Sequence, residues 1–145
     1  MVNANHKIGT VINGRVTEQL LRNIFVNKAP LHDGAVIVRN GRVLGAGCML
    51  PLSKNVNLSR DLGMRHRAGI GMSENSDAVV VIVSEETGTI SVAVGGMLKR
   101  HLAPQTLERL LRQELIKEEA PKTESKIYTA VKGIFTDKEG KRNGK

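Results

Sequence analysis

Aromatic residues are scarce in this chain of 145 residues, which contains no tryptophan, one tyrosine and two phenylalanines. Proteins that bind single-stranded nucleic acid stack bases on aromatic side chains, and Phe25, Phe135 and Tyr128 are too few for such a platform. The net charge of +8 attracts anions. However, the segment from Lys117 to Lys145 holds eight Lys and Arg against five Asp and Glu, so +3 of that charge lies there. We therefore expect an anionic partner but no nucleic acid.

Cysteine and long apolar runs are equally scarce. Cys48 is the single cysteine, which excludes an internal disulfide and is typical of a reducing compartment such as the cytoplasm. No run reaches the roughly 18 consecutive apolar residues of a membrane span. Residues 1–10 lack the apolar segment of a signal peptide. The nucleotide-binding loops GxxxxGK[ST] and GxGxxG are also absent. We expect a cytoplasmic domain that makes no membrane contact through this chain.

The remaining sequence alternates between helical and strand periodicity. Apolar spacing predicts helices over 17–27, from about 59 or 61 to 73, and from Pro104 onward, and strands over 9–12, 35–39, 42–50, 78–83 and 89–94. Thr17 is a candidate N-cap of the first helix, Ser59 or Asp61 of the second, and Asn40-Gly41 predicts a hairpin turn. We expect one α/β (α+β) domain over residues 1–118, with a mixed central β-sheet flanked by helices. Residues 119–145 are predicted to be a charged flexible tail.

Three short motifs carry groups suited to chemistry. In LHDGAVIV, His32 and Asp33 directly precede a glycine and a strand. An Asp-Gly pair is common in ordinary turns. An acid at the rim of a sheet can alternatively bind a metal or accept a proton from a hydroxyl. Both interpretations are open for this motif alone.

The motif LGMRHRAGIG concentrates positive charge at a predicted helix start. Arg65, His66 and Arg67 follow Gly63, whose missing side chain allows a ligand to approach the backbone. A solvated helix surface is one interpretation. Cations at a helix N-terminus are mildly unfavourable unless an anion is bound there, and two arginines can grip phosphate oxygens. The motif is therefore a candidate phosphate clamp.

The motif VSEETG follows a strand of almost continuous β-branched residues. It is either a polar hairpin turn or a set of ligands, since Ser84 offers a hydroxyl and Glu85 and Glu86 offer carboxylates able to hold Mg²⁺ or Mn²⁺. Strand and helix ends are where α/β folds gather ligand-binding groups. The three motifs together supply the groups required for phosphoryl or nucleotidyl transfer.

These motifs, in this order and spacing, resemble the catalytic domain of bacterial diadenylate cyclases of the DisA-N type. The resemblance runs from about Val11 to Ile116 and is strongest to the membrane-anchored type. It implies an enzyme that condenses two ATP molecules into cyclic di-AMP and two pyrophosphates across a face-to-face homodimer. It also implies a divalent metal, Mn²⁺ or Mg²⁺ with Co²⁺ as a further candidate. In a full-length protein of that type, the domain would lie at the cytoplasmic face of the cell membrane.

The resemblance also implies individual roles. Asp33, with Gly34 and Ala35, would contact the ribose and activate its 3′-hydroxyl, and Arg65, His66, Arg67 and Ser84 would engage phosphates. Leu31 and Leu50 would pack around adenine, and His32 and Glu86 would bind the metal. Met49, Gly63, Met64 and Glu85 complete the expected ATP-binding set.

Three features depart from the family pattern. Met64 stands where the family usually has threonine, and Met49 stands where many relatives have an aromatic residue. The helix and strand that normally precede the region matching residues 9–14 are not found here. Two alternative functions follow: an adenine-nucleotide sensor with weakened turnover and, on charge alone, a basic nucleic-acid-binding module.

Overall fold

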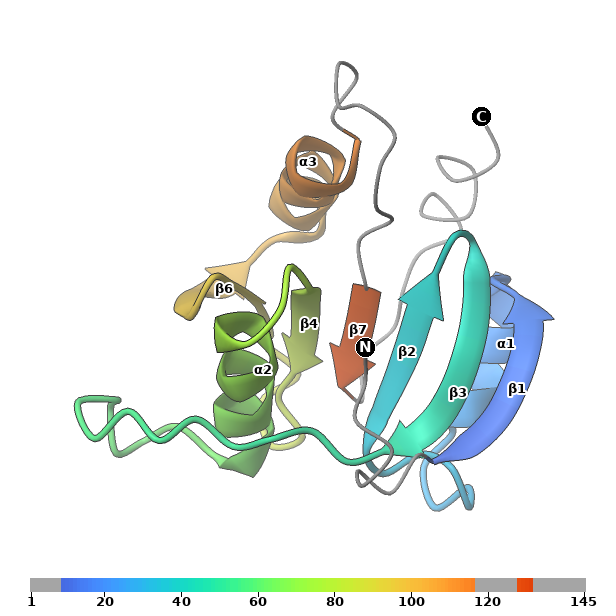
Figure 1. The fold of residues 1–145 in the computed structure, drawn as a ribbon, viewed down its shortest axis with the longest axis horizontal. Helices are drawn as coiled ribbons and strands as arrows, with labels where there is room; N and C mark the ends of the chain where they lie inside the picture. The colour runs from blue at the N-terminus through green and yellow to red at the C-terminus, as the bar shows by residue number, and fades with distance from the viewer. Residues whose placement is uncertain (1–8, 117–127, 132–145) are drawn as a thin grey trace.

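The computed structural model describes residues 9–116 and 128–131, which form a mixed β-sheet with helices on both faces (Figure 1). The elements in chain order are β1 (Thr10–Arg15), α1 (Glu18–Phe25), β2 (Ala35–Arg39), β3 (Arg42–Cys48), α2 (Met64–Glu74), β4 (Val79–Val83), β5 (Ile90–Val94), β6 (Met97–Leu102), α3 (Pro104–Leu115) and β7 (Tyr128–Val131). The strand order across the sheet is β1-β3-β2-β7-β4-β5-β6. The expected mixed α/β architecture is confirmed.

The sheet consists of two antiparallel halves with one strand between them. β1, β3 and β2 form one half, and β4, β5 and β6 form the other. β7 lies between β2 and β4, antiparallel to β2 and parallel to β4. Tyr128–Val131, which fall within the flexible tail predicted over residues 119–145, form a strand at the centre of the sheet. The rest of that segment lies outside the described residues, so the division at residue 118 stays a prediction.

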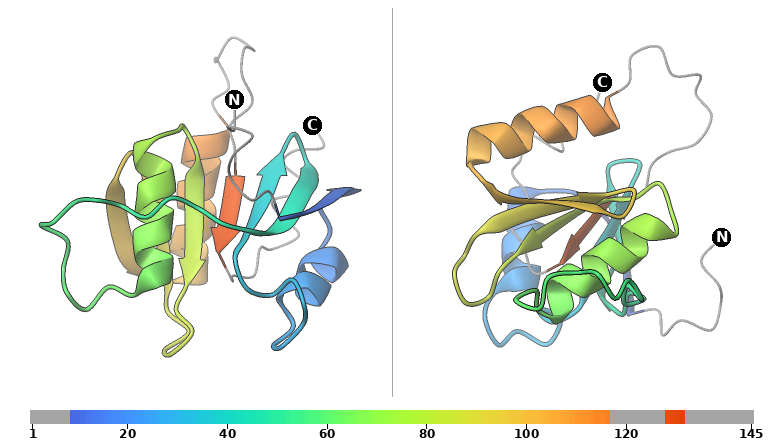
Figure 2. Two further views of the ribbon diagram at one scale, coloured as in Figure 1. Left: turned by 60° about the horizontal axis from the view of Figure 1, so that its bottom comes forward. Right: turned by 90° about the vertical axis from the view of Figure 1, so that its left-hand side faces the viewer.

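Hydrophobic clusters cover both faces of the sheet. α1 and α3 pack on one face, where their buried leucines and isoleucine meet β2, β3 and Val79 and Val81 of β4. α2 packs on the other face through Ile70, which lies in a cluster with Val80 and Ile82. Figure 2 shows α2 and α3 on opposite sides of the sheet. Successive side chains of β4 point alternately into the two clusters, so the strand is buried on both faces. A strand buried on both faces needs apolar residues at every position, which explains its continuous apolar sequence.

Several local predictions are confirmed. The Thr17 hydroxyl accepts a hydrogen bond from the Leu20 amide at 3.1 Å and caps α1. Asn40 and Gly41 both adopt positive φ, 53° and 73°, as a two-residue hairpin turn between β2 and β3 requires. In α3, Pro104 occupies the first turn.

Two local predictions differ from the structure. The N-cap of α2 is Gly63, and neither Ser59 nor Asp61 caps the helix. The Ser59 hydroxyl donates to Asp61, and Asp61 also accepts from Arg100 of β6 at 3.0 Å, so both side chains are engaged elsewhere. Strand β6 was not predicted, because its sequence MLKRHL is mostly exposed at the edge of the sheet and lacks apolar alternation.

Candidate active site

The three sequence motifs converge on one edge of the sheet. β2 begins at Ala35, α2 begins at Met64 and β4 ends at Val83, and all three points lie at the lower edge in Figure 1. Residues separated by some fifty positions in the sequence are thus brought together. This edge is the candidate active site.

Asp33 lies on a tightly packed turn before β2. Gly34 has φ +87°, and a Cβ there would lie 2.8 Å from the Gly47 carbonyl carbon and 2.9 Å from the Cys48 oxygen. Only glycine fits this close approach to the end of β3. The Asp33 side chain remains 82% exposed. The turn therefore fixes the backbone while presenting the carboxylate outward.

Arg65 links the motifs physically. Its Nη2 lies 3.0 Å from Glu85 Oε2 and 3.8 Å from Asp33 Oδ1, so one guanidinium faces carboxylates from two loops. The Arg65 side chain is only 17% exposed. Its Nη1 is buried and has no hydrogen-bond partner among the described residues. A buried guanidinium nitrogen without a partner is costly, and an anionic ligand would satisfy it.

His66 lies on a different side of α2 from Arg65. It belongs to the buried stripe of the helix with Gly69, Ile70 and Ser73, spaced as one helical face requires. Burial lowers the pKa of the His66 imidazole, nearby Arg100 lowers it further, and Asp61 opposes the change. The structure thus places His66 on the buried face of α2 and does not gather it with the carboxylates around Arg65.

Arg67 is directed toward the loop that precedes α2. Its Nη2 donates to the Ser59 carbonyl at 3.4 Å, and its own carbonyl accepts from the Ser53 amide at 2.9 Å. The same loop lies against Gly71, where a Cβ would be 2.1 Å from the Pro51 oxygen. Ser53 further donates from its hydroxyl to Glu74 at 2.6 Å. The arginine pair is therefore divided, with Arg65 beside the carboxylates and Arg67 beside the loop.

The motif after β4 forms a closed turn. The Gly88 amide donates to the Ser84 carbonyl at 2.9 Å, and the Thr87 amide donates to the Ser84 hydroxyl at 3.3 Å. The turn directs Glu85 to Arg65, whereas Glu86 is exposed. The VSEETG motif is therefore a polar turn, and the same turn presents a carboxylate to Arg65. The two interpretations of the motif are compatible.

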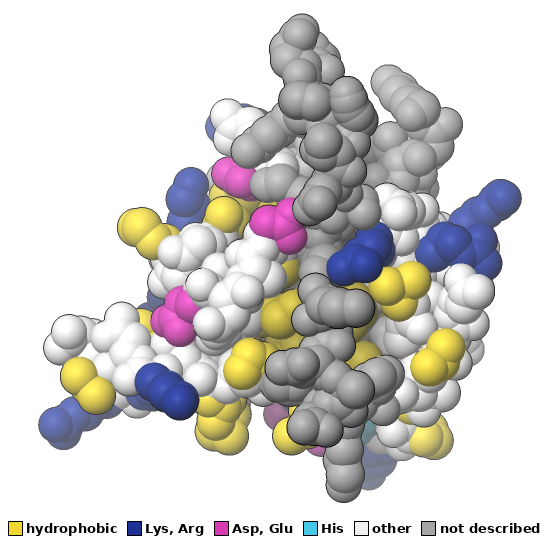
Figure 3. Space-filling model, in the orientation of Figure 1, with side chains coloured by type: hydrophobic (Ala, Val, Ile, Leu, Met, Phe, Trp, Pro, Cys, Tyr) yellow, Lys and Arg dark blue, Asp and Glu magenta, His cyan; other side chains and the backbone are white. Residues whose placement is uncertain are grey.

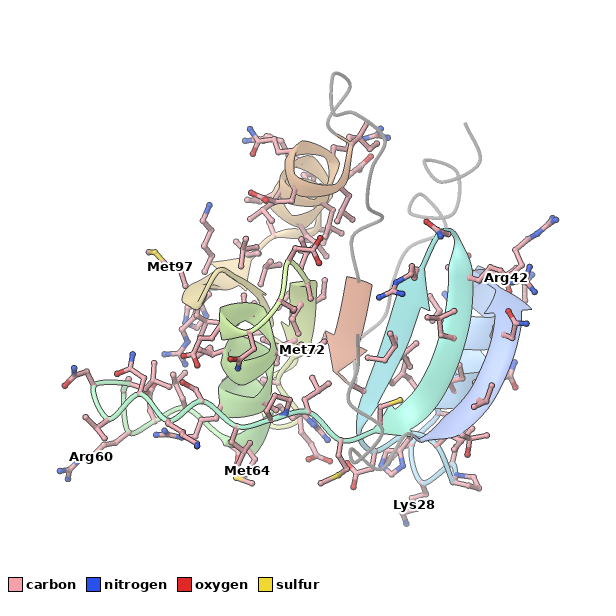
Figure 4. All side chains as sticks on the ribbon, viewed as in Figure 1. Lys28, Arg42, Arg60, Met64, Met72 and Met97 are labelled. Atoms are coloured by element: carbon pink, nitrogen blue, oxygen red, sulfur yellow. The ribbon has the colours of Figure 1, made fainter. Side chains whose placement is uncertain are left out.

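The expected apolar contacts come from the ends of β3 and the loop before β2. Leu31 and Leu50 are half-buried, and a Leu31 methyl would lie 3.5 Å from a Cβ placed on Gly47. Met49 and Met64 are each 67% exposed. Figure 4 shows Met64 at the first turn of α2, directed away from the sheet. These side chains offer apolar surface beside the polar cluster.

His32 is held in place through one ring nitrogen. Its Nδ1 lies 2.8 Å from the Ala29 carbonyl oxygen, which can only accept, so Nδ1 is the donor and Nε2 is the nitrogen that the predicted role as a metal ligand would use. Within residues 9–116 and 128–131, no group of three or more His, Cys, Asp or Glu side chains forms a metal-binding cluster. Mg²⁺ commonly uses one or two carboxylates and completes its shell with substrate phosphates and water. The exposed carboxylate of Glu86 suits that mode of binding.

Positive side chains occur at several places on the surface. On the face shown in Figure 3, described Lys and Arg side chains lie at the right-hand edge and, separately, at the left and lower left. Arg60 and Arg42, labelled in Figure 4, lie at opposite ends of the molecule. None of the helices in the described part of the chain is long and apolar enough to cross a membrane.

Comparison with known proteins identifies the family. Residues 2–98 match the model of the DisA bacterial checkpoint controller nucleotide-binding family, a span that contains every candidate site residue. The chain belongs to this family. The resemblance to the DisA-N type that the three motifs indicated is confirmed.

Curated relatives within this DisA-type family include two bacterial cyclases. The chain is 42% identical over 136 residues to the cyclic di-AMP synthase CdaA of Bacillus subtilis, covering 94% of this chain and 46% of CdaA. It is 43% identical over 125 residues to a diadenylate cyclase of Listeria monocytogenes, covering 86% of this chain and 45% of that protein. The chain thus spans about half the length of these relatives.

Solved structures of relatives share the fold. A double mutant of DacA from Staphylococcus aureus aligns with a TM-score of 0.71 at 39% identity, covering 77% of this chain and 74% of DacA. A hypothetical membrane spanning protein from Bacillus cereus aligns with a TM-score of 0.67 at 45% identity, covering 71% and 50%.

One ion pair near the site was missed at the sequence level. Asp61 and Arg100 anchor the loop before α2 to β6. The hydrogen bonds from Ser59 and Arg100 hold the pKa of the exposed Asp61 carboxyl below its ordinary value. Arg100 lies 39 positions from Asp61 in an unpredicted strand, so no local pattern could have paired them.

Proposed function

We propose that this DisA-type domain is a diadenylate cyclase that converts two ATP molecules into cyclic di-AMP and two pyrophosphates. The observation that carries the proposal is the cluster of Asp33, Arg65 and Glu85, in which a buried guanidinium nitrogen awaits a partner beside an exposed carboxylate. The names of the relatives support the same activity.

Each bond-forming step needs a base and a group that stabilises negative charge. The 3′-oxygen of one ATP attacks the α-phosphorus of the other, a P–O bond to the β-phosphate breaks, and pyrophosphate leaves. Asp33 accepts the 3′-hydroxyl proton, which its exposed carboxylate can do without losing its backbone support. Arg65 donates through Nη1 to a phosphate oxygen, where charge develops in the transition state.

The remaining residues hold the nucleotide. Leu31 and Leu50 contact adenine, with Met49 as a flexible apolar neighbour. Arg67, beside the loop that precedes α2, and the Ser84 hydroxyl, in the turn after β4, contact phosphates, and Gly63 leaves the helix start open to them. His66 lies on the buried face of α2 and supports the helix. The phosphate contact proposed for its ring would form where α2 begins.

A divalent cation, Mn²⁺, Mg²⁺ or Co²⁺, would neutralise the phosphate charge when bound, with His32 Nε2 and Glu86 as its protein ligands.

Two subunits meet with their candidate sites facing each other, because a two-fold product from two identical substrates fits a two-fold enzyme. A domain that uses ATP as its substrate is expected to lie in the cytoplasm. In a membrane-anchored parent protein, it would lie at the cytoplasmic face of the cell membrane.

A nucleotide sensor without turnover is the second candidate, favoured by the exposed methionine at position 64. Incubation with ATP and each of Mn²⁺, Mg²⁺ and Co²⁺, followed by chromatography, separates the two. The cyclase yields cyclic di-AMP and pyrophosphate. A sensor binds ATP and leaves it intact, a result that would reject the proposed activity.

A further inference from the structure

Strand β7 is the neighbour of both strands that carry the candidate site. β2 begins two residues after Asp33, and β4 ends two residues before Glu85. Adjacent strands lie about 4.8 Å apart, so the width of β7 sets a spacing of about 10 Å between β2 and β4. Figure 1 shows β7 in this central position, with its arrowhead toward the edge that bears the site.

The register places the end of β7 at the site. Val131 pairs with Ala35 of β2 on one side and with Ile82 of β4 on the other. The Asp33 turn and the Glu85 turn both continue from these paired positions. Arg65 contacts carboxylates on both turns, at 3.8 Å and 3.0 Å, so its two contacts depend on that spacing.

The strands that flank β7 are deeply buried. Val36 and Val38 of β2 and Val79 to Val81 of β4 are each at most 1% exposed. Backbone amides and carbonyls of such strands need partners, because a buried polar group without one is costly. The pairs between β7 and its two neighbours supply those partners over four residues.

The segment that forms β7 lies beyond the residues that match the family model, although the alignment with CdaA covers 94% of the chain. The match ends at residue 98, whereas β7 spans Tyr128–Val131. We propose that β7 is a positioning element of the nucleotide site: it joins the two half-sheets and sets the separation of Asp33 from Arg65 and Glu85. The spacing set by β7 is independent of the proposed function, whereas its effect on nucleotide binding rests on that function.

Amide hydrogen exchange of the full chain tests the strand directly. In the native protein, Thr129 and Ala130 are interior residues of a central strand, so we expect their amides to exchange about 100-fold or more slowly than in an unfolded peptide. Exchange at the unfolded-peptide rate would overturn the proposal, whatever the enzyme does with ATP.

A pair of variants at one position tests the link to the site. Thr129→Pro removes a backbone donor that a central strand requires, whereas Thr129→Val keeps the amide and the β-branched shape. We expect Thr129→Pro to speed exchange in β2 and β4 while β5 and β6 stay protected, and to weaken binding of a non-hydrolysable ATP analogue at least tenfold. Thr129→Val should match the native protein in both measurements.

The outcomes separate this inference from the proposed function. If Thr129→Pro leaves exchange in β2 and β4 and analogue affinity unchanged, β7 does not position the site. If the variant loses protection throughout the chain, the native exchange at Thr129 and Ala130 still decides whether the strand exists. If the native protein binds the analogue yet forms no cyclic product, the proposed activity fails and the role of β7 is judged on binding alone.

Discussion

Arg65 and Glu85 form an ion pair between the first turn of α2 and the turn after β4, with Nη2 3.0 Å from Oε2. The Glu85 side chain is 64% exposed, so this pair alone adds little stability. Its consequence is orientation: with Nη2 held between Glu85 and Asp33, the second nitrogen of the same guanidinium, Nη1, is fixed in a buried position.

Removing Arg65 should weaken nucleotide binding. Arg65→Ala is expected to lower ATP affinity by about 1.5–3 kcal/mol, the range for hydrogen bonds to charged groups. Isothermal titration with a non-hydrolysable analogue measures it. The matched control is Arg22→Ala, which removes an exposed arginine paired with Glu18 on α1. Equal affinities in the two variants would show that Arg65 does not bind the nucleotide.

Restoring the family's hydroxyl at the start of α2 tests the departure at residue 64. Met64→Thr should raise turnover or ATP affinity, because a threonine hydroxyl there can contact phosphate. The fold should be unaffected, since the methionine is 67% exposed. Steady-state kinetics and binding measure the two quantities. No gain in either would mean that the site functions fully with methionine.

The contact between α2 and the loop before it should tolerate no side chain at residue 71. A Cβ on Gly71 would lie 2.1 Å from the Pro51 oxygen and 2.7 Å from the Ser53 nitrogen, both backbone atoms. Gly71→Ala should therefore lower the free energy of unfolding by about 1–3 kcal/mol. A Cβ on Gly14 would make only ordinary contacts, at 3.5 Å from side-chain atoms of Ile12 and Leu20, so Gly14→Ala is the control in urea unfolding. Equal stability of the two variants would contradict the close packing.

Much of the fold could be predicted from local patterns. Thr17 caps α1 through a bond three residues away, and Asn40-Gly41 needs only its own backbone conformation to turn the hairpin. Leu107, Leu110 and Leu111 form the buried stripe of α3 that their spacing predicts. These features depend on neighbours in the sequence, which is why the sequence reveals them.

The missed features depend on distant partners. β7 is a four-residue strand within a charged segment, stabilised by backbone pairing to β2 and β4 rather than by a pattern of its own. In the sequence, the consecutive residues of the RHR triplet indicate one basic cluster. In a helix, however, successive side chains point in directions about 100° apart. The structure therefore separates Arg65, His66 and Arg67 into three environments.

The buried imidazole of His66 should make stability depend on pH. Burial and Arg100 lower its pKa in the folded state, so the unfolded chain binds a proton more readily. Folding stability should be fully present above the ordinary histidine pKa of about 6.5 and fall as pH drops below it. Urea unfolding at several pH values measures this slope. His66→Gln should flatten it in that window, and an unchanged slope would show that another group controls it.

Mixing native and Asp33→Asn subunits tests the central claim most directly. Asparagine keeps the shape of the side chain but removes the base, so a mixed dimer can form only one of the two bonds and should release a linear dinucleotide. With complete subunit exchange and a native fraction f, the account predicts that cyclic di-AMP falls as f squared while linear product peaks in mixed samples. A fall that is linear in f without linear product, with exchange verified independently, would contradict it.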